Sequence, residues 1–308
     1  MHLASQGTDD NSSFSISIGA YIPSGFSWSQ NSCAYDSILS IIHSIWVTNV
    51  PVWSGIFNLM NSDLLGNLAT DFAQCKAGVM RLDSARDRLR RKMSSISQNK
   101  FGWGRFTSIE EVLKYLLTMP TITIESSQHC EMQHIYPDVI ENNTCCVISQ
   151  GLRSHISIEQ WITDLKEYTH HQCETCHQPV YQYSSMCHIL PILVFDFPGE
   201  SPVINLQFTM NVNGTNALYK LRGIIYFGDN HFTSCIIHES GMTWFHDGMV
   251  TCHNVSYEGY ANSINSLNMC RGKQALLQYI LLFQGEVHGS DSAKYVIHNA
   301  NLKYICDT

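Results

Sequence analysis

The chain of 308 residues has little charge, and the charge it has is mainly acidic. It carries 18 lysines and arginines against 26 acidic residues, a formal net charge of −8. Positive charge supplies most of the affinity of proteins for phosphate backbones, so we expect no nucleic-acid partner. The one basic run, residues 81–92, is interrupted by Asp83 and Asp87. We interpret it as the solvent-facing side of a helix.

Two further absences bear on the compartment. No stretch reaches the ~18 consecutive apolar residues typical of a membrane-spanning helix. The N-terminal residues also lack the basic-then-apolar order of a signal peptide. We therefore expect an intracellular protein, in the cytoplasm or nucleus, without a membrane partner. Its twelve cysteines are then expected to be reduced, which favours metal binding, catalysis or simple burial over disulfides.

The order of the patterns along the chain predicts helices first and a sheet second. Residues 1–15 are polar and rich in Ser and Asn, so we expect them to be disordered. A short strand is expected at 16–22, and mainly helical structure from 38 to 117, with helices over 57–72 and 79–93. The β-like runs are residues 121–124, 145–148, 189–197, 218–252 and 274–283, with a short helix at 158–165. The predicted fold class is α+β with a mixed or antiparallel sheet.

One cysteine stands at the start of a predicted helix. Cys33 follows a polar loop, residues 28–32, and large apolar residues then recur at helical spacing, at Ile38, Ile41, Ile42, Ile45 and Trp46. A thiol at a helix N-terminus meets the positive end of the dipole, which favours the nucleophilic thiolate. Taken alone, such a cysteine is more often a buried core residue.

A histidine and an acid follow on predicted strands. Residues 219–237 indicate a strand, a tight turn and a second strand with His231 at its start, and a third short strand ends at Asp247. Strands of this length place Asp247 beside His231, where a carboxylate can orient the imidazole. His238 and His246 are competitors, but each alternates to the other side of its strand.

Two short motifs between these segments have the spacing of metal ligands. Cys130 and His134 are separated by three residues, and Cys173 and Cys176 by two. Thiolate and imidazole ligands at such spacings suit tetrahedral zinc, and four protein ligands would make the zinc structural. The alternative is a pair of metal-free loops. Further candidate ligands lie nearby, at His129, His170, His171, His177, Cys187 and His188.

The order Cys, His, Asp is that of a papain-like protease, and two segments resemble a particular family. Residues 31–37, Asn-Ser-Cys-Ala-Tyr-Asp-Ser, resemble the cysteine box Asn-Thr-Cys-Tyr-Met-Asn-Ser of ubiquitin-specific proteases. Residues 219–248 resemble their histidine box at Tyr219, Leu221, Gly223, His231, Phe232, Trp244 and Asp247. Asp36 and the His-Phe pair are similar to the divergent SUMO-isopeptidase branch. Where the family has an oxyanion-hole Asn, five residues before the nucleophile, this chain has Trp28; Asn31, Gln30 or a main-chain N–H would have to substitute.

The resemblance implies a USP-type right-hand architecture within a catalytic domain at 16–285. A thumb would span about 30–118, fingers 121–190 and a palm 189–285, followed by a C-terminal extension at 286–308. The resemblance also implies a role for each site residue: Cys33 as nucleophile, His231 as base and Asp247 as the residue that orients it.

The expected activity is that of a cysteine isopeptidase acting through a thioester. It would cleave ubiquitin or a ubiquitin-like modifier such as SUMO from lysine side chains or precursors, as a monomer. Two alternatives remain open. One is a catalytically inactive modifier-binding module of the same fold, and the other is a zinc-stabilised interaction module in which Cys33 is a core residue.

Overall fold

The N-terminal part of the protein is helical. The computed structural model describes residues 21–148, 157–198, 203–264, 267–270, 273–274 and 278–287. Its first elements are α1 (Cys33–Thr48), α2 (Val50–Met60), a π-helical turn (Ser62–Gly66), α3 (Asn67–Lys76), α4 (Leu82–Ile96), α5 (Gln98–Phe101) and α6 (Ile109–Leu116). Side-chain caps fix several of the starts: Asn49, Asn61 and Ser108 each accept a hydrogen bond from a main-chain N–H three residues later.

An eight-stranded mixed sheet forms the body of the protein. Its strands are β3 (Cys146–Ile148), β6 (Ile192–Pro198), β7 (Gln207–Val212), β8 (Thr215–Gly228), β9 (His231–Ile237), β10 (Met242–His246), β11 (Ser256–Tyr260) and β14 (Gln278–Val287). The order is β11-β10-β9-β8-β14-β6-β3, and β7 pairs with β8. The β3–β6 pair is parallel, whereas the other pairs are antiparallel. Helix α7 (Ile158–Asp164), a 3-10 turn (Ala261–Ser263) and the small hairpin β12 (Met269–Cys270) and β13 (Lys273–Gln274) complete the described elements.

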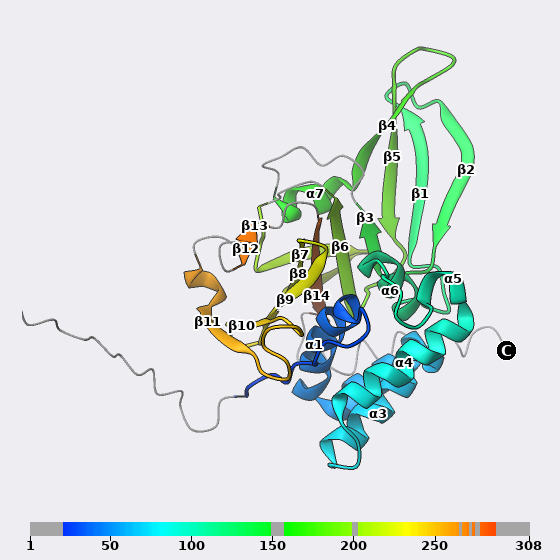
Figure 1. The fold of residues 1–308 in the computed structure, drawn as a ribbon. Helices are drawn as coiled ribbons and strands as arrows, with labels where there is room; N and C mark the ends of the chain where they lie inside the picture. Colours follow the sequence, from blue (N-terminus) through cyan, green and yellow to red (C-terminus); the bar gives the residue numbers. More distant parts are fainter. Residues whose placement is uncertain are drawn as a thin grey trace, which may run out of the picture.

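A separate four-stranded antiparallel sheet projects from this body (Figure 1). It consists of β1 (Ile124–Cys130), β2 (Ile135–Asn142), β4 (Lys166–Gln172) and β5 (Pro179–Met186), in the order β2-β1-β5-β4. The central pair is β1 with β5, in a register that sets Cys130 opposite Val180. The β1–β2 turn and the β4–β5 turn therefore lie at the same end of the sheet.

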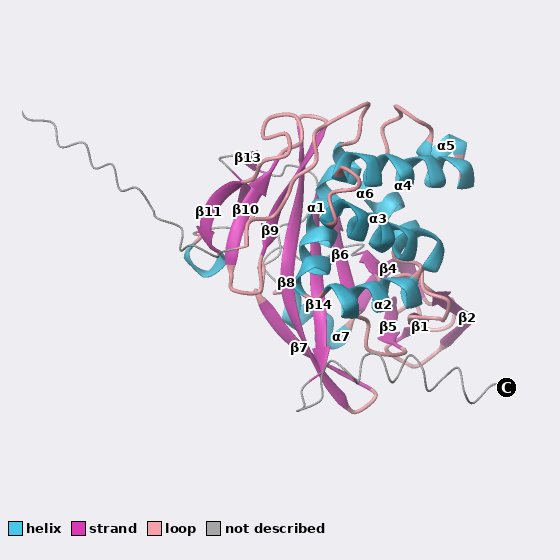
Figure 2. Ribbon diagram, turned by 90° about the horizontal axis from the view of Figure 1, so that it is seen from below, coloured by secondary structure: helices cyan, strands magenta, loops and turns pink. Residues whose placement is uncertain are grey.

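Helix α1 lies between the other helices and the large sheet (Figure 2). Ile38, Ile41 and Ile42 are fully buried, as their spacing predicts. One close contact is at Gly223 of β8, where a Cβ atom would lie only 2.5 Å from Cγ1 of Ile41. A side chain at position 223 would therefore force the Ile41 side chain, or α1 with it, to move.

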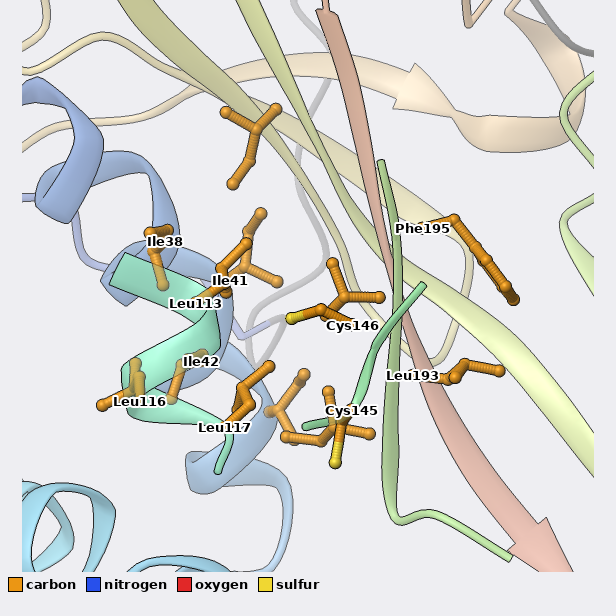
Figure 3. Packing of buried hydrophobic residues seen from close by; sticks show 14 of the residues in the cluster. Ile38, Ile41, Ile42, Leu113, Leu116, Leu117, Cys145, Cys146, Leu193 and Phe195 are labelled. Carbon is orange, nitrogen blue, oxygen red and sulfur yellow. The ribbon is translucent and has the colours of Figure 1, made fainter. Parts of the chain in front are cut away.

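Both faces of strand β6 are covered, as its nearly continuous apolar sequence predicts. On one face, buried residues of α1 and α6 pack towards the β3 segment, and Leu193 and Phe195 point to the other side (Figure 3). There the Phe195 ring contacts Trp161 of α7 and Phe208 of β7. The core is thus continuous through the sheet.

The α+β class and the helices-then-sheet order are confirmed, but several predicted bounds are wrong. Residues 57–72 are not one helix, because Asn61 ends α2 and caps the π-helical turn. Residues 121–123 precede β1, and Thr123 instead hydrogen-bonds the carbonyls of Asn142 and Thr144. Residues 21–22 are not in a strand. The predictions for 1–20 and 288–308 lie outside the described residues. No described helix is both long and apolar enough to cross a membrane.

Candidate functional site

Cys33 is the first residue of α1, as predicted, and its thiol is buried. The residue is 4% exposed. Burial raises the pKa of the thiol above its ordinary value, and the charge of Asp36 raises it further. The main-chain N–H groups of Phe232, Ala34 and Cys33 act in the opposite direction, but more weakly in sum. The N–H groups at the helix start thus favour the thiolate, as expected, but burial outweighs them and the pKa of the thiol is raised in sum.

His231 and Asp247 form the predicted pair. The Nε2 atom of His231 lies 2.8 Å from Oδ1 of Asp247, and both side chains are largely buried. Oδ1 also accepts hydrogen bonds from the N–H groups of Met249 and Val250. These bonds hold the carboxylate in place, and the bond at Nε2 leaves Nδ1 as the ring nitrogen that can act as a base.

The nucleophile candidate lies where α1 packs against β9, the strand that begins at His231. The thiol of Cys33 accepts from the N–H of Phe232, the residue directly after His231. The sequence brings these parts together because β8, β9 and β10 form consecutive antiparallel pairs. The Cys33 thiol therefore lies against the main chain next to His231, and the end of β10 places Asp247 beside that histidine.

A segment before the helix ties this site together. The N–H of Trp28 donates to the carbonyl of Gly248, next to Asp247. A Cβ at Gly248 would lie 3.0 Å from both Oδ2 of Asp36 and the carbonyl of Phe26. The chain entering α1 thus packs closely against the turn that carries the acid.

The competing histidines have other contacts. His246 is fully buried, and its Nε2 lies 3.0 Å from both the N and O of Phe26. Burial lowers the pKa of its imidazole, which stays neutral. His238 pairs with Ser240 at a turn. Neither pairs with Asp247 in the way His231 does.

Trp28, Gln30 and Asn31 lie in the loop that leads into Cys33. Trp28 is 38% exposed and supplies no amide. The side-chain amide of Asn31 donates to the carbonyl of Gly104 at 2.6 Å, so it connects the loop before Cys33 to the α5–α6 loop. Gln30 and Asn31 both have positive φ, 51° and 58°.

The basic run is a solvated helix face only in part: Arg88, Arg91 and Lys92 are exposed, but two arginines turn inwards, which corrects the interpretation of residues 81–92. Arg86 and Arg90 are each 2% exposed. Arg86 forms a 2.8 Å ion pair with Asp36 and also donates to the carbonyl of Ser27. Burial raises the pKa of Asp36 to about 7, although Arg86 opposes this shift. The two arginines are four residues apart and so lie on one face of the helix, a spacing that does not by itself tell a buried face from an exposed one.

The four predicted metal ligands lie together at the far end of the projecting sheet. The ligand atoms of Cys130, His134, Cys173 and Cys176 are all within 4.8 Å of one another. Sγ of Cys130 is 3.5 Å from both Nδ1 of His134 and Sγ of Cys176, and Sγ of Cys173 is 3.5 Å from Nδ1 of His134. Ligands on a tetrahedral zinc stand about 3.8 Å apart, so the residues fit the ion.

Tight turns at the two hairpin tips produce this arrangement. Gln133 and His177 take positive φ values of 61° and 57° within them. The N–H of Gln133 bonds back to the Cys130 carbonyl, and the N–H of His177 to the Cys173 carbonyl. The N–H groups of Cys176 and Thr175 lower the pKa of the Cys173 thiol to about 6, which favours the thiolate that a metal requires. Among the further candidate ligands, the His129 ring stacks on Tyr183 instead.

Solved structures share this fold. A chain of the SAGA DUB module Ubp8/Sgf11/Sus1/Sgf73 bound to monoubiquitin matches with a TM-score of 0.54 at 13% identity, over 89% of this chain and 73% of that one. The same module bound to ubiquitin aldehyde matches with a TM-score of 0.52 at 14% identity, over 86% and 70%. No protein-family model matches the chain, and no curated protein matches it. At these identities the likeness concerns the fold, which is similar to that of the Ubp8 deubiquitinase module.

Proposed function

We propose that this chain is a cysteine isopeptidase that removes ubiquitin or a ubiquitin-like modifier from lysine side chains or precursors. The observation that supports the proposal is the His231–Asp247 pair together with the contact of the Cys33 thiol with the N–H of Phe232, the residue after His231. The likeness to a ubiquitin-bound DUB module supports a modifier of this class. SUMO remains a candidate because Asp36 and the His-Phe pair resemble the SUMO-isopeptidase branch.

In the proposed reaction His231 acts as a general base, because the pKa of Cys33 is raised in the resting protein. Nδ1 takes the thiol proton as Sγ attacks the carbonyl carbon of the modifier's C-terminal glycine. The imidazolium, stabilised by Asp247, then gives its proton to the leaving lysine amine. Water hydrolyses the thioester in the second half, with His231 accepting its proton, which releases the modifier carboxylate and restores the thiol.

The three parts of the structure would correspond to the thumb, palm and fingers of a right-hand architecture. The helices are the thumb that carries Cys33, the eight-stranded sheet is the palm that carries His231 and Asp247, and the projecting sheet forms the fingers. Zinc held by Cys130, His134, Cys173 and Cys176 would cross-link the two finger tips. The folded part of the modifier would lie against the fingers, with its C-terminal tail between thumb and palm. We propose a monomer acting inside the cell.

A modifier with a C-terminal electrophile tests the activity. Ubiquitin and SUMO probes are incubated in parallel with the wild type, with Cys33→Ala, and with Cys252→Ala as a control for an exposed cysteine. We expect one probe to form a covalent adduct with the wild type and the control, but not with Cys33→Ala. An adduct that persists in Cys33→Ala, or none with either probe, contradicts the proposal.

A second function, an inactive modifier-binding module, is favoured by one observation. Trp28 stands where the related proteases have an oxyanion-hole amide, and removing one such donor costs about 10²–10³ in rate. The same experiment separates the two, because the inactive module would bind one modifier without forming an adduct. Binding to neither modifier would favour the zinc-stabilised interaction module.

A further inference from the structure

Arg90 of α4 reaches the loop that leads into Cys33. Its side chain is 3% exposed. Nη1 donates to the carbonyl of Ser29 at 3.0 Å, and Nη2 donates to the carbonyl of Gln30 at 2.6 Å. The planar guanidinium, with its fixed fork of donors, suits two consecutive carbonyls better than a lysine would. Arg90 therefore fixes the orientation of two successive peptide units.

Those two peptide units belong to a strained turn. Gln30 and Asn31 both occupy the left-handed region, with φ of 51° and 58°, and side chains other than glycine rarely adopt it. Such a conformation persists only where its surroundings determine it, and it is common at functional sites. Here Arg90 holds one side of the turn, and Gly104 accepts from the Asn31 amide on the other.

Arg90 is itself held by aromatic rings. Its guanidinium carbon lies 4.4 Å from the ring centre of Trp103 and 5.3 Å from that of Tyr35. Tyr35 is in the first turn of α1, two residues after the cysteine. The cation is thus fixed relative to the helix end that carries Cys33, and not only relative to the loop.

The orientation of these peptides matters for the reaction. The C=O and N–H of a trans peptide point in opposite directions, so carbonyls directed at Arg90 turn the N–H groups of Gln30 and Asn31 away from α4. The turn continues into the first N–H groups of α1, which have no acceptor within the helix. Trp28 has no amide to offer, and the Asn31 amide is engaged with Gly104.

Building on the proposed isopeptidase activity, we propose that Arg90 is a positioning residue for the oxyanion of the reaction. It holds the turn before Cys33 so that main-chain N–H groups between Gln30 and Cys33 receive the negative oxygen of the tetrahedral intermediate. These groups replace the side-chain amide that the related proteases carry at the position of Trp28. Arg90 itself does not contact the substrate.

Two reactions of Cys33 separate this role from a structural one. Hydrolysis of a modifier C-terminal amide passes through an oxyanion, whereas alkylation of the thiol by chloroacetamide does not. We expect Arg90→Met to lower kcat on a fluorogenic C-terminal amide of ubiquitin or SUMO by about 10²–10³-fold. KM and the rate of Cys33 alkylation should each stay within about threefold of the wild type, because the thiol and the modifier contacts remain.

Arg91→Met is the matched control, because Arg91 is exposed on the same helix. It should leave kcat and alkylation unchanged. Arg90→Lys keeps the charge as a compact ammonium but lacks the planar fork of donors, so it should fold and show a kcat between those of the wild type and Arg90→Met. A kcat within threefold of the wild type in both Arg90 variants would overturn the role of Arg90. An Arg90→Met alkylation rate that falls by the same factor as its kcat would also overturn it, because it would show a general effect on Cys33. Absence of turnover in the wild type on both modifiers contradicts the isopeptidase proposal instead, and the role of Arg90 falls with it.

Discussion

At the scale of single residues, burial favours the protonated thiol of Cys33 over the thiolate. Its burial and the charge of Asp36 both disfavour the thiolate, and the helix N-terminus does not compensate. In the reaction that we propose, His231, oriented by Asp247, accepts the thiol proton when a substrate carbonyl arrives. The proposed arrangement differs from a preformed thiolate–imidazolium pair, in which the sulfur would be deprotonated before substrate binds.

The pH dependence of Cys33 alkylation tests this arrangement. Because the pKa of the thiol lies above its ordinary value of 9.0, the rate of reaction with chloroacetamide should rise in a single step centred above pH 9. Asp36→Asn should move the step to lower pH, because it removes a negative charge near the sulfur. The measurement is peptide mapping by mass spectrometry between pH 5 and about 10. The exposed Cys252 in the same digest reports on the reagent. A half-maximal rate below about pH 7 would instead indicate a preformed ion pair.

Residue patterns predicted some of this site and not the rest. The pairing of His231 with Asp247 could be predicted because strand alternation and a tight turn are local properties. The burial of Arg86 and Arg90 could not. Their sequence resembles any charged helix, and only the tertiary packing of α4 against the loop at 27–30 gives each guanidinium carbonyls to bind. Asp36 was noticed as a departure from the cysteine box, but its ion pair with Arg86 depends on the same packing.

At the scale of elements, the position of α1 on the sheet determines the site. Helix α1 carries Cys33 and β9 carries His231, and the two elements pack together. The helix also makes a close contact with β8 at Gly223. The predicted strands of residues 218–252 were correct, because turns at 228–230 and 239–241 separate clearly apolar runs. Interruptions such as the π-helical turn after Asn61 were missed, because they follow from capping contacts and not from apolar spacing.

Gly223→Ala is expected to destabilise the protein by about 1–3 kcal/mol, the usual cost of overfilling a packed core. The added Cβ would lie 2.5 Å from Cγ1 of Ile41, so the Ile41 side chain or α1 must shift. Urea unfolding measures the loss. Gly228→Ala on the same strand is the control, since a Cβ there meets nothing within 4 Å; its stability should stay within about 0.5 kcal/mol. Equal stabilities of the two variants would show that the contact between α1 and β8 is not close-packed.

At the scale of the whole molecule, the protein consists of a helical part and a large sheet that share one core, and a projecting sheet with its own small cluster. The buried members of that cluster are Cys130, Cys173 and Val180. Three buried residues provide little hydrophobic stabilisation for the end of a four-stranded sheet. The far end therefore depends on whatever joins the two tips. The α+β class was predictable from the order of patterns. The projection of one sheet from the body depends on which strands pair, so it was not predictable from those patterns and was implied only by the family resemblance, as fingers over 121–190.

Loss of zinc should therefore disorder the tips of the projecting sheet without affecting the core around α1, and it should slow the reaction with the modifier more than the alkylation of Cys33. We expect about one zinc per chain in the wild type, measured by elemental analysis after gel filtration, and loss of that zinc in Cys173→Ser. Cys252→Ser, at an exposed cysteine outside the cluster, should keep it.

Removing the ion frees the tips but leaves the core around α1 intact, so alkylation of Cys33 should stay within about threefold of the wild type. Reaction with the full-length modifier probe should slow by a much larger factor, because the fingers no longer hold a fixed surface. Full zinc in Cys173→Ser would refute the ligand set, and an equal loss of both reactions would show that the projecting sheet and the body unfold as one unit.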